Sequence, residues 1–250
     1  MDDIVVKSRK REEHFRVLKR VFERCRAFKL RMNPLKCAFG VSSGKFLGFL
    51  VHSRGIDVDP AKATAIATMR PPATVKELKS FLGKVSYIRR FIPGLASITF
   101  AFTKLLKKGQ SFEWGEAQQT AFKRLQQIMM NLLMVQAPIH KKSLLLYLAT
   151  NLYAIGALIA QEDRGGTEQP IYFISRALKD AETRYPRAER ACLAIVYASQ
   201  RLRHYFLAYE VWLMTKSHAI KALLQQLILS GRISPVVATI ITIRLENGDT

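Results

Sequence analysis

The chain has 250 residues, and its hydrophobic content of 49% is typical of a folded protein rather than a disordered one. Its apolar runs are too short to cross a bilayer, and the N-terminus lacks the basic-then-apolar layout of a signal peptide. The formal net charge is +21, and residues 1–110 hold 24 Lys and Arg against 8 Asp and Glu. So uneven an excess indicates a polyanionic partner, of which nucleic acid is the commonest. A merely solubilising surface is the alternative, but it does not require this asymmetry.

The three cysteines, Cys25, Cys37 and Cys192, are far apart and odd in number. This pattern argues against a disulfide framework and against a paired-cysteine metal site. We expect small, reduced side chains packed among other apolar groups.

The first 60 residues alternate between acidic, apolar and basic stretches. Asp2 and Asp3 precede residues 4–6, Ile-Val-Val, which favour a buried strand. Residues 11–30 predict an amphipathic helix, and residues 44–60 predict a hairpin because Gly44, Gly48 and Gly55 separate short β-rich pieces. The apolar stripe of the helix consists of Phe15, Leu18, Val21, Phe22, Cys25 and Phe28.

The next segment is helical and strongly basic. Residues 60–70 predict a short helix that ends at Pro71-Pro72, and residues 112–129 predict another, with Ala121, Phe122, Leu125 and Ile128 inward. Between them, Thr74 and Glu77 form a capping-box pattern at the start of a helix that ends at Pro93-Gly94. Its apolar stripe is Val75, Leu78, Leu82, Val85 and Ile92, and its basic residues are Lys76, Lys79, Lys84, Arg89 and Arg90.

The last third predicts a sheet. Residues 143–150, 153–162 and 169–178 read as three apolar strands, residues 188–206 as a helix and residues 210–215 as a fourth strand. Three strands, a helix and a further strand fit an α/β sheet domain.

Adjacent carboxylates such as Asp2 and Asp3 can hold hard cations, Mg²⁺ or Mn²⁺, which prefer oxygen ligands. Two such ions can bind the attacking and leaving oxygens of a phosphoryl transfer. For an isolated Asp-Asp pair a solvated turn is the better explanation, so the pair has to be interpreted together with the motifs that follow it.

Those motifs form an ordered set. "MDDIVVKS", "NPLKCAFG", "KFLGFLVHSRGI" and "FLGKVSYIRRFIPG" follow one another along the chain. Together they resemble the reverse transcriptase of gypsy-type LTR retrotransposons, especially plant elements. The family hallmark is Tyr-x-Asp-Asp in the polymerase palm, and Met1 stands at x.

The resemblance implies an α+β to α/β architecture: a partial polymerase palm with a helical thumb, followed by an RNase H-like mixed-sheet domain. We expect the end of the palm with its primer-grip hairpin in 1–58 and a basic thumb and connection in 59–143. A degenerate, incomplete RNase H-like domain would occupy 144–224, and a divergent tail 225–250.

By this resemblance Asp2 and Asp3 match two of the three metal-binding carboxylates of the palm, and the third lies upstream in the family. Phe46, Leu47 and Gly48 match the primer grip. The basic residues of the thumb helix, Lys76, Lys79, Lys84, Arg89 and Arg90, would face the phosphates of a duplex, although a solvated helix face is the alternative.

In the RNase H-like region three carboxylates that the family uses are replaced. Ala149, Ala191 and Lys216 stand at their positions, and methyl or ammonium groups cannot coordinate Mg²⁺. Glu189 is two residues from Ala191 and so faces elsewhere on a helix, and His218 reads as an ordinary polar residue. We therefore expect no nuclease activity from this domain.

Three functions follow. The first is part of a retrotransposon RNA-directed DNA polymerase with an attached RNase H-like domain, using Mg²⁺ or Mn²⁺. The second, which we expect of the chain in isolation, is a catalytically inactive nucleic-acid-binding remnant. The third is a protein scaffold formed by the RNase H-like domain. The partners implied are an RNA–DNA hybrid or other nucleic acid and the rest of the polyprotein, with no membrane. The location implied is intracellular, in a cytoplasmic particle, the nucleus or both.

Overall fold

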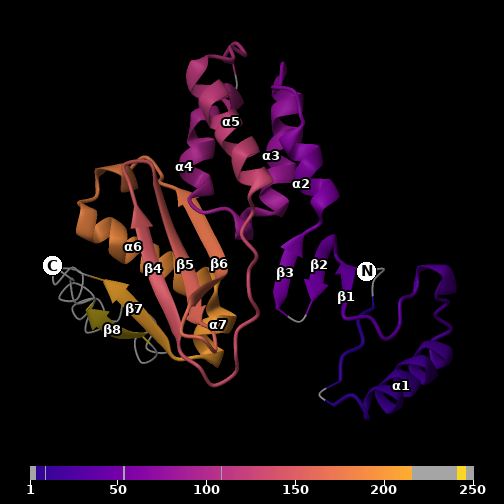
Figure 1. Ribbon diagram of the computed structural model, residues 1–250. Helices are drawn as coiled ribbons and strands as arrows, with labels where there is room; N and C mark the ends of the chain where they lie inside the picture. The colour runs from indigo at the N-terminus through magenta and orange to yellow at the C-terminus, as the bar shows by residue number, and fades with distance from the viewer. Residues whose placement is uncertain (1–3, 9, 53, 108, 216–240, 246–250) are drawn as a thin grey trace. The chain divides into compact units, whose positions relative to one another are not determined.

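The computed structural model describes residues 4–8, 10–52, 54–107, 109–215 and 241–245 (Figure 1). The chain divides into two compact units, residues 1–59 and residues 60–250. No helix among the described residues is both long enough and apolar enough to cross a membrane.

The first unit begins with helix α1 (His14–Ala27), which forms where the apolar periodicity predicts a helix. Its predicted inward stripe is wrong at both ends, because Phe15 is 82% exposed and Phe28 is 74% exposed. Cys25 is the one buried residue of this helix. The periodicity therefore identifies the helix but not a surface that covers it.

A three-stranded antiparallel sheet follows, in the order β1 (Ser43–Phe46), β2 (Phe49–His52) and β3 (Gly55–Val58), after the short helix η1 (Pro34–Lys36). This confirms the hairpin and adds a third strand. Lys45 and Asp59 form an ion pair at 2.9 Å. The strand expected at residues 4–6 is wrong: the described chain there has no strand partner, and Ile4 and Val5 are more than half exposed.

The second unit opens with a group of helices around an aromatic core. They are α2 (Pro60–Ala67), α3 (Val75–Tyr87), η2 (Arg89–Phe91), α4 (Leu95–Thr99), η3 (Phe100–Phe102), η4 (Lys104–Leu106) and α5 (Glu116–Met130). Phe81, Phe102 and Phe122 are at most 1% exposed, and the Phe81 and Phe122 ring centroids are 5.0 Å apart. Phe81 belongs to the buried face of α3, although the predicted apolar stripe does not include it.

The start of α3 confirms the capping prediction in part. The Thr74 hydroxyl accepts a hydrogen bond from the Glu77 backbone N–H at 3.2 Å. The Glu77 carboxylate reaches the backbone N–H of Ala73 rather than that of Thr74. The α-helix ends at Tyr87, earlier than predicted, and η2 carries the chain to Ile92.

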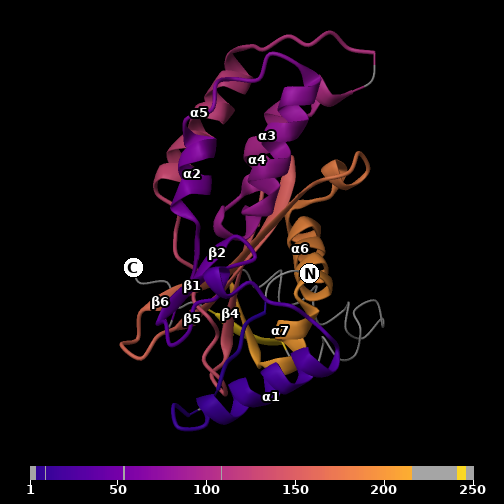
Figure 2. The ribbon, with the colours of Figure 1, turned by 90° about the vertical axis from the view of Figure 1, so that its right-hand side faces the viewer.

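The rest of this unit is a five-stranded mixed sheet in the order β6-β5-β4-β7-β8 (Figure 1). Figure 2 shows its strands β4, β5 and β6 from a second direction. The strands β4, β5 and β6 are antiparallel neighbours, whereas β7 runs parallel to β4 and β8 runs parallel to β7. The bounds are β4 (Leu144–Thr150), β5 (Ala154–Glu162), β6 (Glu168–Ala177), β7 (Val211–Thr215) and β8 (Ile241–Leu245). The four strands predicted here are confirmed, and β8 was not expected.

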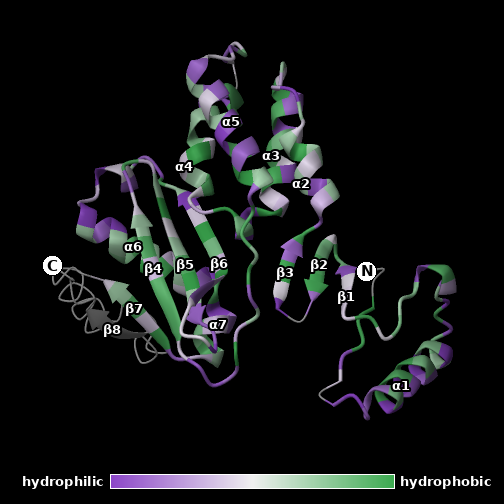
Figure 3. Ribbon diagram, viewed as in Figure 1, coloured by the Kyte–Doolittle hydropathy of each residue, from purple (hydrophilic) through white to green (hydrophobic). Residues whose placement is uncertain are grey.

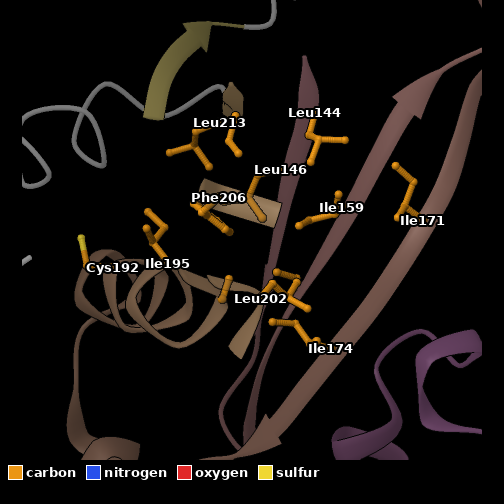
Figure 4. Close-up of a cluster of buried hydrophobic side chains, with 13 residues drawn as sticks. Leu144, Leu146, Ile159, Ile171, Ile174, Cys192, Ile195, Leu202, Phe206 and Leu213 are labelled. Atoms are coloured by element: carbon orange, nitrogen blue, oxygen red, sulfur yellow. The ribbon is translucent and has the colours of Figure 1, made fainter. Parts of the chain in front are cut away.

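Between β6 and β7 the chain forms η5 (Glu182–Arg184), α6 (Arg187–Arg201) and α7 (Arg203–Ala208). The cluster in Figure 4 joins Ile195, Leu202 and Phe206 of this region to Leu144 and Leu146 of β4. All five are at most 1% exposed. Figure 3 shows the hydrophobic colouring concentrated on β4 and β5, as expected of strands covered by helices.

Candidate nucleic-acid interface and the expected carboxylate positions

The predicted primer-grip residues form the turn of the β1–β2 hairpin. Phe46 ends β1, Phe49 begins β2, and Leu47 and Gly48 have φ of 47° and 75°. Two successive positive φ values match the right-handed twist of the flanking strands, but Leu is an uncommon residue in that conformation. The Leu47 side chain is 50% exposed at the tip.

The three lysines of the predicted thumb helix are exposed. One face of α3 packs into the core through Leu78, Phe81 and Val85, and the rest of the helix surface is therefore available to solvent. The exposed lysines on that surface are Lys76, Lys79 and Lys84. The structure thus places three ammonium groups on the solvent side of one helix, an arrangement that can contact successive phosphates.

The two arginines after α3 lie in the short helix η2 and differ in environment. Arg89 is exposed, whereas Arg90 is half-buried with its guanidinium 4.8 Å from the centre of the Tyr172 ring on β6. Burial raises the pKa of nearby Tyr205, and the Arg90 charge opposes that rise. Arg90 therefore also holds the helical segment against the sheet, a role that the sequence alone did not indicate.

The expected metal ligands of the palm, Asp2 and Asp3, lie outside the described residues, as do Lys216 and His218. Among the residues that are described, no group of three or more His, Cys, Asp or Glu side chains could hold a metal ion.

The two described positions of the RNase H-like region are both alanines in regular structure. Ala149 is exposed near the end of β4 and pairs with Gly156 of β5. Ala191 is 4% exposed in α6, and Glu189 is exposed in the first turn of the same helix. The methyl groups offer no ligand to Mg²⁺, so these positions do not fit the metal that the family resemblance implies.

The charged side chain of Arg190 in α6 lies close to the turn that follows β4. The Arg190 guanidinium donates through Nη1 to the carbonyl oxygen of Asn151, which follows β4. Its Nε is buried and has no hydrogen-bond partner among the described residues. The Asn151 side chain orders the turn by accepting from the backbone N–H groups of Tyr153 and Ala154. The sequence gives no indication of a role for Arg190, because the family motif places its expected carboxylate at the neighbouring Ala191.

Two family models match the chain. Residues 1–51 match the reverse transcriptase (RNA-dependent DNA polymerase) family, and residues 114–213 match the RNase H-like domain found in reverse transcriptase. The first match includes the hairpin turn, and the second covers α5 and the strands from β4 into β7.

Curated relatives are retrotransposon polyproteins. The chain is 33% identical over 219 residues to the retrovirus-related Pol polyprotein from transposon 297 of Drosophila melanogaster. That alignment covers 87% of the chain and 20% of the relative. It is 28% identical over 205 residues to the transposon Tf2-3 polyprotein of Schizosaccharomyces pombe, covering 82% of the chain and 15% of the relative. The chain thus spans a fifth or less of these two relatives.

Solved structures share the fold. A foamy viral protease-reverse transcriptase in complex with RNA/DNA hybrid superposes with a TM-score of 0.76 at 18% identity, over 97% of this chain and 34% of that one. The same viral protein in complex with dsDNA gives 0.75 at 17% identity, over 96% and 52%.

The chain therefore matches the reverse transcriptase and RNase H-like domain families over these two ranges, and the relatives described above are retrotransposon polyproteins. Its α+β fold, with helices followed by a mixed sheet, is that of the viral protease-reverse transcriptase, which confirms the predicted fold class.

Proposed function

We propose that this chain supplies primer-grip, thumb and connection parts of an RNA-directed DNA polymerase and binds an RNA–DNA duplex through its phosphates. The observation that carries the proposal is the exposed lysine surface of α3, in a fold shared with a viral reverse transcriptase in complex with RNA/DNA hybrid. The proposed palm carboxylates are Asp2 and Asp3. A bound Mg²⁺ or Mn²⁺ pair would stabilise the charge that develops during nucleotide transfer.

The finer assignment to gypsy-type elements, and to a plant source, rests on "NPLKCAFG" and "FLGKVSYIRRFIPG" and is part of the proposal. So is the division into palm (1–58), thumb and connection (59–143), RNase H-like domain (144–224) and tail (225–250). From the same resemblance we propose an intracellular location, in a particle, the nucleus or both.

The test is binding of a fluorescently labelled RNA–DNA hybrid, followed by anisotropy across a range of salt concentrations. The slope of log affinity against log salt is negative, and each lost phosphate contact lowers its magnitude by about 0.9. The triple change Lys76→Gln, Lys79→Gln and Lys84→Gln should therefore reduce the slope by about 2 to 3. The matched control removes three exposed charges from other helical positions, through Lys104→Gln, Lys123→Gln and Arg124→Gln.

A smaller change of the salt slope in the control variant than in the α3 variant would support duplex binding by the α3 lysines. Equal losses in both triple variants would contradict the assignment to α3, and absent or salt-independent binding would contradict nucleic-acid recognition as a whole.

We also propose that the RNase H-like domain binds without hydrolysing RNA. Two observations support this proposal. The side chain of Ala149, near the end of β4, is a methyl group, and Ala191 is buried in α6. Purified protein should leave the RNA strand of a hybrid intact with either Mg²⁺ or Mn²⁺. Reproducible cleavage that survives removal of contaminating nuclease would overturn this proposal.

A further inference from the structure

A cavity of about 240 Å³ lies within the second unit, between the segment from the end of α3 to α4 on one side and β6 with α6 on the other. The contact between α4 and β6 is ordered by a hydrogen bond of 2.9 Å from the Ala96 backbone N–H to the Ser175 hydroxyl. The buried residues Phe173 and Ile174 form part of its lining. The walls come from elements that the core already holds in place.

The lining is unusually rich in cations. Three arginines line it, Arg89, Arg176 and Arg201, together with the hydroxyl-bearing residues Ser86 and Tyr197. None of the described residues that line the cavity is acidic. Guanidinium and hydroxyl donors without a carboxylate favour an anion and disfavour a divalent metal ion.

The three arginines are not equivalent. Arg176 is held in a two-bond ion pair with Glu182, at 2.7 and 3.0 Å, and its guanidinium lies 5.4 Å from the centre of the Tyr197 ring. Its charge is therefore already balanced. Arg89 and Arg201 are exposed, and neither takes part in the ion pairs found among the described residues. Two uncompensated cations thus share one preformed cavity.

From this arrangement we infer that the cavity binds the phosphate group of a nucleotide, with Arg89 and Arg201 as its charged contacts. Arginine forks match the geometry of phosphate oxygens. The volume lies below the roughly 300–1,000 Å³ of sites for drug-sized ligands, which suits a single phosphate and sugar rather than a duplex. The inference rests on the proposed function for its ligand class, because nucleotides are the phosphates that a polymerase-related protein meets.

The experiment is isothermal titration of the full chain with three probes: inorganic phosphate, adenosine 5′-monophosphate, and a short single-stranded oligonucleotide with or without a 5′-phosphate. Arg89→Gln and Arg201→Gln should each weaken binding roughly tenfold or more, the loss expected for a charge-assisted hydrogen bond. Arg203→Gln is the matched control, because this exposed arginine lies two residues beyond Arg201 and does not line the cavity.

Binding of the monophosphate that falls in both cavity variants and not in the control supports a site for free nucleotides. Binding of only the 5′-phosphorylated strand, with the same losses, supports the site and assigns the phosphate to a strand end. The inference is overturned if no probe binds or if Arg203→Gln weakens binding equally. Salt-sensitive hybrid binding that persists in that case leaves the proposed function standing, so the two failures are distinguishable.

Discussion

Helix α1 of the first unit and helix α6 of the second have similar amphipathic sequences and very different surroundings. In α6 the apolar face is buried against β4 and β5, including Ala194, Ile195 and Ala198 at no more than 1% exposure. In α1 only Cys25 is buried, and Phe15 is 82% exposed. The comparison shows that periodicity determines that a helix forms, whereas burial depends on a second surface that the local sequence does not encode.

The largest effect on stability is expected when an apolar side chain is truncated in each unit, which tests this contrast in burial. Leu146 in β4 is 0% exposed, so Leu146→Ala should lower the free energy of unfolding by about 2 to 5 kcal/mol. Phe15→Ala should change it by about 0.5 kcal/mol or less. Urea unfolding followed by far-ultraviolet circular dichroism measures both, because each unit contains a described helix whose signal is lost on unfolding. Equal losses would contradict the contrast.

A glycine pair gives a sharper test within the second unit. A Cβ at Gly156 of β5 would lie 3.0 Å from the carbonyl oxygen of Ile174 on β6, so Gly156→Ala should destabilise the protein by about 1 to 3 kcal/mol. At Gly83 on α3 a Cβ would meet nothing within 4 Å, so Gly83→Ala should stabilise by about 0.5 to 1 kcal/mol. Thermal unfolding of the two variants measures the opposite signs.

The ion pair between Arg176 and Glu182 should make stability depend on pH. Its hydrogen bonds hold the pKa of Glu182 below the ordinary 4.5, so the stabilisation is present above that value and is lost as the pH falls through the lower, folded-state pKa. At pH 7, Glu182→Gln should destabilise by about 1 to 2 kcal/mol, and the difference from the unmodified protein should shrink in acid.

The control for that experiment is Glu162→Gln, which removes a surface ion pair with Lys142 at 3.5 Å. Exposed pairs contribute about 0 to 1 kcal/mol, so this variant should unfold nearly as the unmodified protein does. A pH-independent effect of Glu182→Gln would show that packing, not charge, is responsible.

The smallest perturbation is chemical modification of cysteine thiols, which tests burial without changing the sequence. Burial raises the pKa of the Cys192 thiol in α6, and the nearby Glu189 charge raises it further. Cys37, half-buried in the first unit, should react with iodoacetamide at least about tenfold faster than Cys192 in the native protein. Mass spectrometry of timed samples resolves the two sites, and equal rates would contradict the difference in burial.

Much of the second unit could be predicted from the sequence because its local signals agree with its packing. The Thr74 cap, the stripe of α3 and the apolar strands β4 to β7 all appear where the patterns place them. Sheet order could not be predicted, since it depends on pairings between distant segments. The strand β8 was missed for the same reason, because its partner β7 lies far back along the chain.

The candidate site was predictable only where a motif is contiguous. Leu47 and Gly48 form the expected hairpin turn, and the α3 lysines are exposed as expected. The roles of these residues, and of Ala149 and Ala191, stay predictions. The cavity around Arg201 gave no signal, because its arginines come from three separate elements and converge only in the folded chain.

The parallel pairing of β4 with β7 has a kinetic consequence. β4, β5 and β6 are neighbours in sequence and can form an antiparallel meander by short loop closures, whereas β7 joins only after α6 and α7 have crossed the sheet. Until then the inner edge of β4 is open, with apolar Leu144, Leu145 and Leu146 beside unpaired backbone groups. The central strand of the finished sheet is thus an aggregation-prone edge of the growing one, and slow closure by β7 would favour association between chains during refolding.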